Sequence, residues 1–137
     1  MNRTDLQNLT RIRLKETKAL LDKKLYDGAY YLCGYAVECA LKACLAKRTK
    51  RHDFPDKQVA NESYTRDLNR LIGVAGLEIS HKAEGLRDSN FSVNWAIVKD
   101  WSEKSRYELH TPAAAQDLYS AVTDKKHRVL RWLRLHW

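Results

Sequence analysis

The residues that could do chemistry gather in WSEKSRYELHTP, residues 101–112 of this 137-residue chain, which holds Arg106, Tyr107, Glu108 and His110. An imidazole titrates near neutral pH and can exchange a proton, and a guanidinium can hold a phosphate with two donors. The stretch is therefore a candidate reaction centre, in which His110 could act as acid or base and Arg106 could hold a phosphate. Tyr107 could stack on a base, and Glu108 could orient one of the other two.

The same stretch is also typical of a hinge before a helix. Thr111 and the proline after it form an N-cap and a first helical position, so His110 lies just outside the last helix. Within one helix, Arg106 and His110 would share a face about 6 Å apart along the axis. An extended chain would separate their Cα atoms by up to about 14 Å. In the alternative interpretation, Arg106 pairs with Glu108 or Glu38, and His110 only precedes the cap.

The elements that must position these residues are helices, because the chain has only five Gly and two Pro and shows no alternating strand pattern. We expect an all-α, up-and-down helical bundle of three long helices plus short helices, in a single domain over residues 1–137. The long helices are expected from an N-cap at Thr4 to about Leu25, from about 30 to 48, and from Thr111 almost to Trp137. Short helices are expected at 64–75, 78–88 and 91–101, and a basic loop at 47–57.

The second helix carries two distinct faces. Its broad apolar face includes Cys33 and Cys44; these thiols and Cys39 lack a Cys-x-x-Cys pattern, so we expect three buried core residues. A narrow stripe at i, i+4, i+7 and i+11 holds Tyr31, Tyr35, Glu38 and Lys42. Glu38 and Lys42 have the order that favours an ion pair. The stripe is either a solvated face or the wall of a cleft or subunit interface.

A net charge of +8 and a pI near 9.5 favour a polyanionic partner, either nucleic acid or an acidic protein. The expected nucleic-acid contacts are the clustered cations Lys47, Arg48, Lys50, Arg51, Arg128 and Arg131. Arg128 and Arg131 fall late in the predicted last helix, where the helix dipole also favours cations. The dipole is therefore the alternative explanation for these two residues.

Several classes of protein are disfavoured. The chain has no glycine-rich phosphate loop, no His-Glu-x-x-His and no zinc-type cysteine spacing, so we expect neither a metal ion nor a cofactor. No apolar run reaches the roughly 18 residues of a membrane span, and the N-terminus is polar. We therefore expect a cytoplasmic chain without a membrane segment.

Three segments carry a resemblance to a known family: AVECALKA in the second helix, TRDLNRL after the basic loop, and SRY at 105–107. Over about residues 10–133, the chain resembles the HEPN domain (higher eukaryotes and prokaryotes nucleotide-binding). The resemblance implies a small up-and-down helical bundle that commonly dimerises. Many members are metal-independent ribonucleases, often toxins encoded beside a small nucleotidyltransferase, and others are non-catalytic binders.

Catalytic members of this family carry an Arg and a His near the start of the final helix, with four to six residues between them, and two copies meet across a dimer. Arg106 falls at the position of that Arg, but His110 follows after only three residues. The strict spacing occurs from Arg131 to His136, at the far end of the last helix, and we discount it.

Two functions remain open, and with them the question of whether the chain is an enzyme. The first is a HEPN-type protein that binds RNA or a nucleotide and cleaves RNA with Arg106 and His110 at a dimer cleft. Its expected supporting residues are Tyr107, Glu108, Glu38, Lys42 and Tyr35. The second is a non-catalytic binding or regulatory subunit that pairs with a small nucleotidyltransferase.

Overall fold

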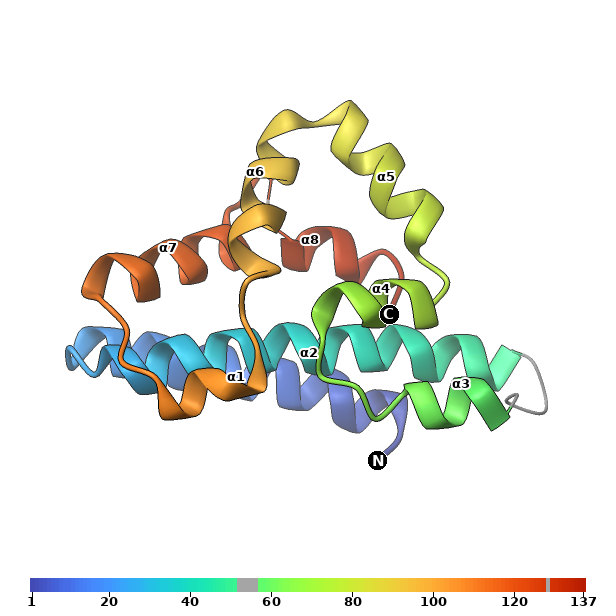
Figure 1. Ribbon diagram of the computed structural model, residues 1–137, viewed down its shortest axis with the longest axis horizontal. Coiled ribbons are helices and arrows are strands. Elements are labelled where there is room, and N and C mark those ends of the chain that lie inside the picture. The colour runs from blue at the N-terminus through green and yellow to red at the C-terminus, as the bar shows by residue number, and fades with distance from the viewer. Residues whose placement is uncertain (52–56, 128) are drawn as a thin grey trace.

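The computed structural model describes residues 1–51, 57–127 and 129–137, without the side chains at 50, 51, 58 and 59. These ranges contain helices and no strand, which confirms the all-α prediction (Figure 1). The helices are α1 Arg3–Asp22, α2 Tyr26–Arg51, α3 Lys57–Glu62, α4 Leu68–Val74, α5 Glu78–Arg87, α6 Ser89–Val98, the 3-10 turn η1 Glu103–Tyr107, α7 Pro112–Thr123 and α8 Val129–Arg134.

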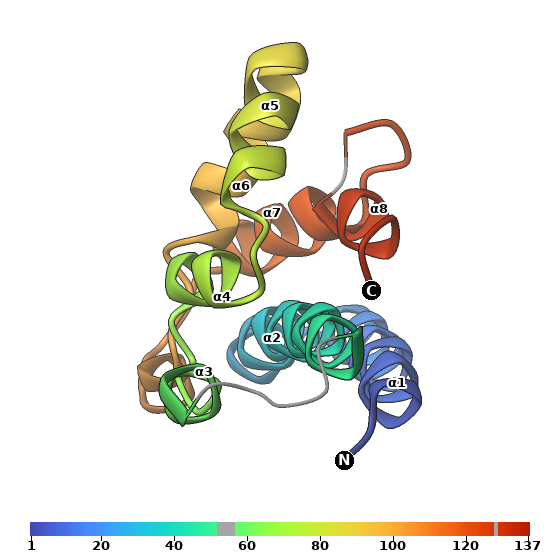
Figure 2. The same ribbon diagram turned by 90° about the vertical axis from the view of Figure 1, so that its right-hand side faces the viewer.

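The first two helices form an antiparallel pair along the base of the molecule (Figures 1 and 2). Asn2, not Thr4, is the N-cap of α1: its side chain accepts from the Asp5 amide, and the Asp5 side chain accepts from the Asn2 amide. The break between the helices lies at Lys24, whose φ of 59° is left-handed. Helix α2 therefore begins at Tyr26, earlier than the predicted start after Gly28.

Helix α2 is the centre of the core and is covered on nearly every side. Helix α1 lies on one flank, and α4, α7 and α8 lie across the other (Figure 2). The three cysteines of α2 are buried and free, as predicted. Burial raises the pKa of the Cys39 thiol to about 11 and that of Cys44 to about 12, so both stay protonated at neutral pH.

The last long helix starts as predicted but does not run to Trp137. The Thr111 side chain accepts from the Ala114 amide at 3.0 Å, so the predicted N-cap is confirmed. The helix ends at Thr123 because Asp124 turns out of helical geometry and its carboxylate accepts from the backbone amides of the next turn. An Asp that caps its own following amides competes with helix continuation, and α8 begins only at Val129.

The predicted basic loop at 47–57 is wrong at both ends. Helix α2 continues through Arg51, and α3 begins at Lys57; residues 52–56 lie outside the described residues. Lys and Arg are good helix formers, and their charges are favoured near a helix C-terminus, so the basic run extends α2.

Helices α5 and α6 form an arm that projects away from the α1–α2 pair (Figures 1 and 2). Asp88 ends α5 and caps α6, because its side chain accepts from the amides of Asn90 and Phe91. Helix α6 buries Phe91, Trp95 and Val98, whereas α5 has no buried residue.

Candidate functional site

Arg106 lies on η1, which is fixed to the bundle by Trp101. That indole is 1% exposed and lies over Gly34 of α2, where an added Cβ would stand 2.1 Å from its Cγ. The Ser105 amide donates to the Ser102 carbonyl at 3.0 Å, which forms the turn. The Arg106 guanidinium is exposed, stands 4.9 Å from the centroid of the Tyr107 ring, and forms no ion pair with a described residue. It is therefore available to an anionic ligand.

His110 is held on three sides by its own chain. Its backbone amide donates to Oδ1 of Asp27 at 2.5 Å, and its ring stacks on Tyr30 with centroids 3.8 Å apart. Nε2 lies 3.1 Å from the Ser105 carbonyl oxygen, which can only accept, so Nε2 carries a proton. Nδ1 forms no hydrogen bond with a described residue and is the nitrogen that can exchange a proton.

The stretch from 106 to 110 is not a single helix. Turn η1 ends at Tyr107, and Glu108 is extended, with φ −110° and ψ 152°. Within the described ranges, no hydrogen bond or ring contact joins the side chains of Arg106 and His110. The two side chains therefore come from adjacent but different pieces of backbone, and Tyr107, 80% exposed, stands beside Arg106.

The alternative in which Arg106 pairs with Glu38 is wrong, because Arg66 occupies that position. Glu38 is 2% exposed, and its Oε1 lies 3.0 Å from Lys42 Nζ and 3.6 Å from Arg66 Nε. The predicted ion pair of Glu38 with Lys42 is confirmed. The stripe on α2 is thus not a solvated face, since Glu38 is buried and Tyr31, Tyr35 and Lys42 are partly covered.

Arg66 connects this cluster to η1, and sequence reasoning missed it. Its Nη1 lies 3.7 Å from Oε2 of Glu103, the first residue of η1. Its guanidinium also lies 5.9 Å from the centroid of the Tyr35 ring, whose other neighbouring cation is Arg13 at 5.8 Å. Tyr35 and Glu38 are therefore connected to η1 through Arg66, and Lys42 is connected through Glu38. No ion pair or cation–π contact in the described part of the chain joins these three residues to Arg106. The signal was present in TRDLNRL, where Arg66 immediately precedes the N-cap Asp67 of α4.

Among the cations expected to contact nucleic acid, Lys47 and Arg48 lie far from His110 along α2. Lys47 and Arg48 are exposed near the end of α2, and Arg48 Nη1 donates to the Val74 carbonyl at 2.8 Å. Seventeen residues of helix separate Tyr30, which stacks on His110, from Lys47, a distance of about 25 Å at 1.5 Å per residue. Arg131 is exposed on α8. Arg128 and the side chains of Lys50 and Arg51 lie outside the described residues.

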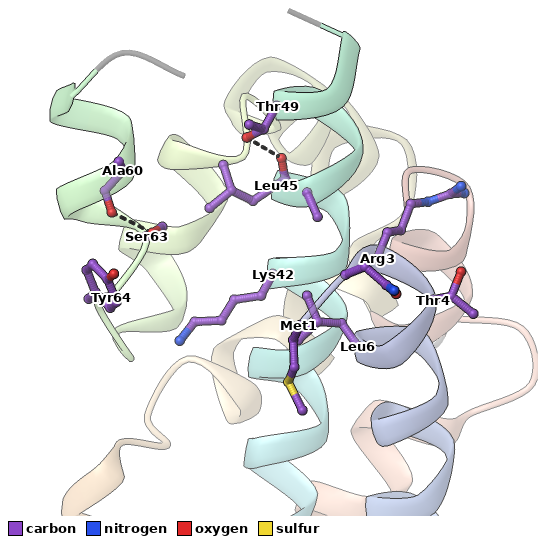
Figure 3. Close-up of a pocket in the computed structure, with 12 residues that line it drawn as sticks. Met1, Arg3, Thr4, Leu6, Lys42, Leu45, Thr49, Ala60, Ser63 and Tyr64 are labelled. Carbon is purple, nitrogen blue, oxygen red and sulfur yellow. Dashed lines mark hydrogen bonds between the residues drawn. The ribbon is translucent and has the colours of Figure 1, made fainter. Parts of the chain in front are cut away.

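One cavity lies away from Arg106 and His110. It has a volume of about 810 Å³ and lies between the start of α1, the second half of α2 and α3 (Figure 3). Its lining is mostly apolar, and its cations are engaged: Lys42 with Glu38, and Arg3 with the Trp137 carbonyl. A second cavity of about 420 Å³ is lined by residues 64–67 and 99–104, including Arg66. Neither Arg106 nor His110 lines either of these cavities.

The part of the chain that the structure describes offers neither a metal-binding cluster nor a membrane-spanning helix. No group of three His, Cys, Asp or Glu side chains in the described ranges is arranged to hold a metal ion. None of the described helices has the length and apolar character needed to cross a bilayer.

The fold and site define a class: a helical bundle around one central buried helix, with an exposed arginine and an oriented histidine before its final helical segment. The family model of the HEPN domain matches residues 10–135, and the chain belongs to this family. Membership indicates a function related to nucleotides or RNA. Comparison with curated proteins and with solved structures gave no match.

Proposed function

We propose that this HEPN-domain protein binds RNA and cleaves it without a metal ion, using Arg106 and His110 in a cytoplasmic homodimer. One observation carries the proposal. The Ser105 carbonyl and the Tyr30 ring hold the His110 imidazole with Nδ1 unoccupied by described residues, while the nearby Arg106 guanidinium is exposed and forms no ion pair with them. These are the two functional groups that a metal-free cleavage of RNA requires.

The chemistry follows from those groups. Nδ1 of His110 takes the proton of a 2′-hydroxyl, whose oxygen attacks the adjacent phosphorus. The bond from phosphorus to the 5′ oxygen breaks, and that oxygen leaves with a proton from the imidazolium of the second copy. Arg106 holds the phosphate as its charge develops, and the exposed Tyr107 ring offers a face to a base. The products are a 2′,3′-cyclic phosphate and a 5′-hydroxyl.

The test is RNA cleavage by the purified chain in the presence of a chelator. We expect His110→Ala to lower the rate about 10²- to 10⁴-fold, because it removes proton transfer. Arg106→Ala should also be severely impaired. Lys104→Ala is the matched control, since it removes an exposed cation from the same turn and should change the rate only slightly. Equal trace activity in the wild type and all three variants would end the proposal.

A second candidate function rests on the packing of His110. A ring stacked on Tyr30 and hydrogen-bonded to Ser105 is also what a purely structural histidine shows. In that case the chain is a non-catalytic partner whose basic surface binds RNA, a nucleotide or an acidic small nucleotidyltransferase.

Thermal unfolding separates the two functions. A structural His110 predicts that His110→Ala lowers the melting temperature and leaves cleavage absent in every form. Gel shifts against rising salt then test polyanion binding, because each phosphate contact to a single strand steepens the dependence of log K on log salt by about 0.7. Affinity that does not change with salt would contradict binding through the basic surface.

A further inference from the structure

Helix α5 is amphipathic, but its large apolar side chains face solvent and several of its polar side chains face the rest of the chain. Its inner face, which meets α6, α4 and Trp132, carries Ser80, His81, Glu84 and Gly85. Its two large aliphatic side chains point away from the chain: Ile79 is 86% exposed and Leu86 is 90% exposed. Helices of globular proteins normally direct such residues inward, so the outer face of α5 lacks its apolar partner.

The outer face forms one continuous stripe. Ile79, Lys82, Ala83 and Leu86 stand at i, i+3, i+4 and i+7, the spacing of a single helix face, and all four are exposed. We name these four residues the α5 stripe. Ala83 near its centre is small enough to let another helix approach closely, and the two aliphatic residues lie on either side of that centre.

The charge of α5 distinguishes it from the rest of the chain. Its Glu78 and Glu84 balance Lys82 and Arg87, so the helix is neutral, whereas the whole chain carries a formal charge of +8. A polyanion would be drawn to other parts of the surface. A second copy meets no net repulsion between like charges at α5.

The helix is also complementary to itself. If two copies of α5 pack antiparallel about a two-fold axis between Lys82 and Ala83, Ile79 faces Leu86 of the second copy, since both are equally far from that axis. In the same register, Glu78 faces Arg87 of the second copy. Arg87 pairs within its own chain with Glu84, whose side chain is 20% exposed, and the Arg87 side chain, 71% exposed, can also meet a carboxylate of the second copy.

From this arrangement we propose that the α5 stripe is a self-association surface, on which α5 of a second copy packs antiparallel. A ten-residue helix is about 15 Å long, so the contact is smaller than the roughly 800 Å² per partner of a stable interface. The dimer formed through α5 is therefore weak and depends on protein concentration. This contact is independent of the proposed RNA cleavage, because α5 lies at the opposite end of the molecule from η1, the orange turn at the lower left of Figure 1.

Cross-linking through Ala83→Cys tests the geometry directly. The new thiols would face each other across the axis, and the native cysteines are buried with raised pKa values, so a short bis-maleimide has little background. We expect dimer to form about tenfold faster than in the control Asn61→Cys, an exposed position on α3, which belongs neither to α5 nor to the surface around Arg106 and His110. Adding Leu86→Lys to Ala83→Cys should abolish the difference. Equal rates for Ala83→Cys and Asn61→Cys would overturn the proposal.

Charge reversal tests the register. Glu78→Arg alone places a second guanidinium opposite Arg87 of the other copy, and Arg87→Glu alone places two carboxylates opposite each other. Each variant should sediment as a smaller species than the wild type, and an equimolar mixture should recover the sedimentation of the wild type, because the two variants are complementary. A mixture that sediments like its separate components would refute this antiparallel register. RNA cleavage is measured on the same variants and should equal that of the wild type, because the α5 contact is independent of the proposed cleavage. A failure of one proposal can therefore be told from a failure of the other.

Discussion

The close contact between Gly34 and Trp101 predicts that Gly34→Ala is strongly destabilising. The added Cβ would lie 2.1 Å from Cγ of the indole and 2.2 Å from Cδ1 and Cδ2, whereas ordinary contacts begin near 3.4 Å. These are inner atoms of the ring, so a retreat of about 1.3 Å requires movement of the Trp101 backbone or of α2. Overpacking of this kind costs up to about 3 kcal/mol, and the better helix propensity of Ala returns about 1 kcal/mol.

The expected net loss is therefore about 2 kcal/mol in the free energy of unfolding, or about 6–8 °C in melting temperature for a chain of this size. Urea unfolding followed by far-UV circular dichroism measures it, and near-UV circular dichroism reports the displaced indole. Because Trp101 leads directly into η1, the proposed function predicts that RNA binding through Arg106 weakens as well.

Gly73→Ala is the matched control for this substitution. Gly73 lies in helix α4, and a Cβ added there meets no heavy atom within 4 Å. The same chemical change should therefore stabilise the protein by up to about 1 kcal/mol through helix propensity alone. If Gly34→Ala stabilises the protein as much as Gly73→Ala does, the close contact with Trp101 does not exist and the reasoning fails.

Three further predictions follow from local environments. Thr111→Ala should cost about 1 kcal/mol in urea unfolding, because α7 loses its N-cap; an unchanged midpoint would exclude that role. Cys39 and Cys44, with raised pKa values, should react with a thiol reagent at pH 8 only as fast as the protein opens, and immediate labelling would contradict their burial. Burial lowers the pKa of His81, so stability should be full above about pH 6.5 and fall as the unfolded chain takes up a proton below it. His81→Phe should flatten that slope in thermal scans across pH 5–7.5.

The helical class and several boundaries could be predicted because local chemistry decides them. Thr111 followed by Pro112 determines the start of α7 without help from distant residues, and the structure has that cap. The run of small and apolar residues around Cys33 and Cys44 predicted a buried helix, and α2 is buried. These features depend on the residues themselves and on their nearest neighbours in the chain.

Other features depend on interactions that compete with the local helix pattern or come from distant residues. The hydrophobic periodicity of the sequence does not reveal these interactions. The apolar pattern of the last helix continues past residue 124, but Asp124 caps the following amides and interrupts it. Tyr31, Tyr35, Glu38 and Lys42 looked like a stripe open to solvent or to a cleft, because no pattern within α2 reveals that Arg66 covers Glu38 from 28 positions away. Contacts of long sequence separation therefore account for most of what was missed at the site.

The separation along α2 limits how one RNA could use the whole surface under the proposed function. Arg106 and His110 lie at the Tyr30 end of this helix, and Lys47 lies about 25 Å away near the other end. At about 3.4 Å per stacked nucleotide, one strand would need roughly seven nucleotides to reach from the phosphate at Arg106 to Lys47. A substrate shorter than that would contact only η1 and its neighbours, so its cleavage would depend weakly on salt, whereas a longer one would add the phosphate contacts of the basic end. The proposed catalytic and binding groups are thus linked by the length of the RNA and not by a shared cleft.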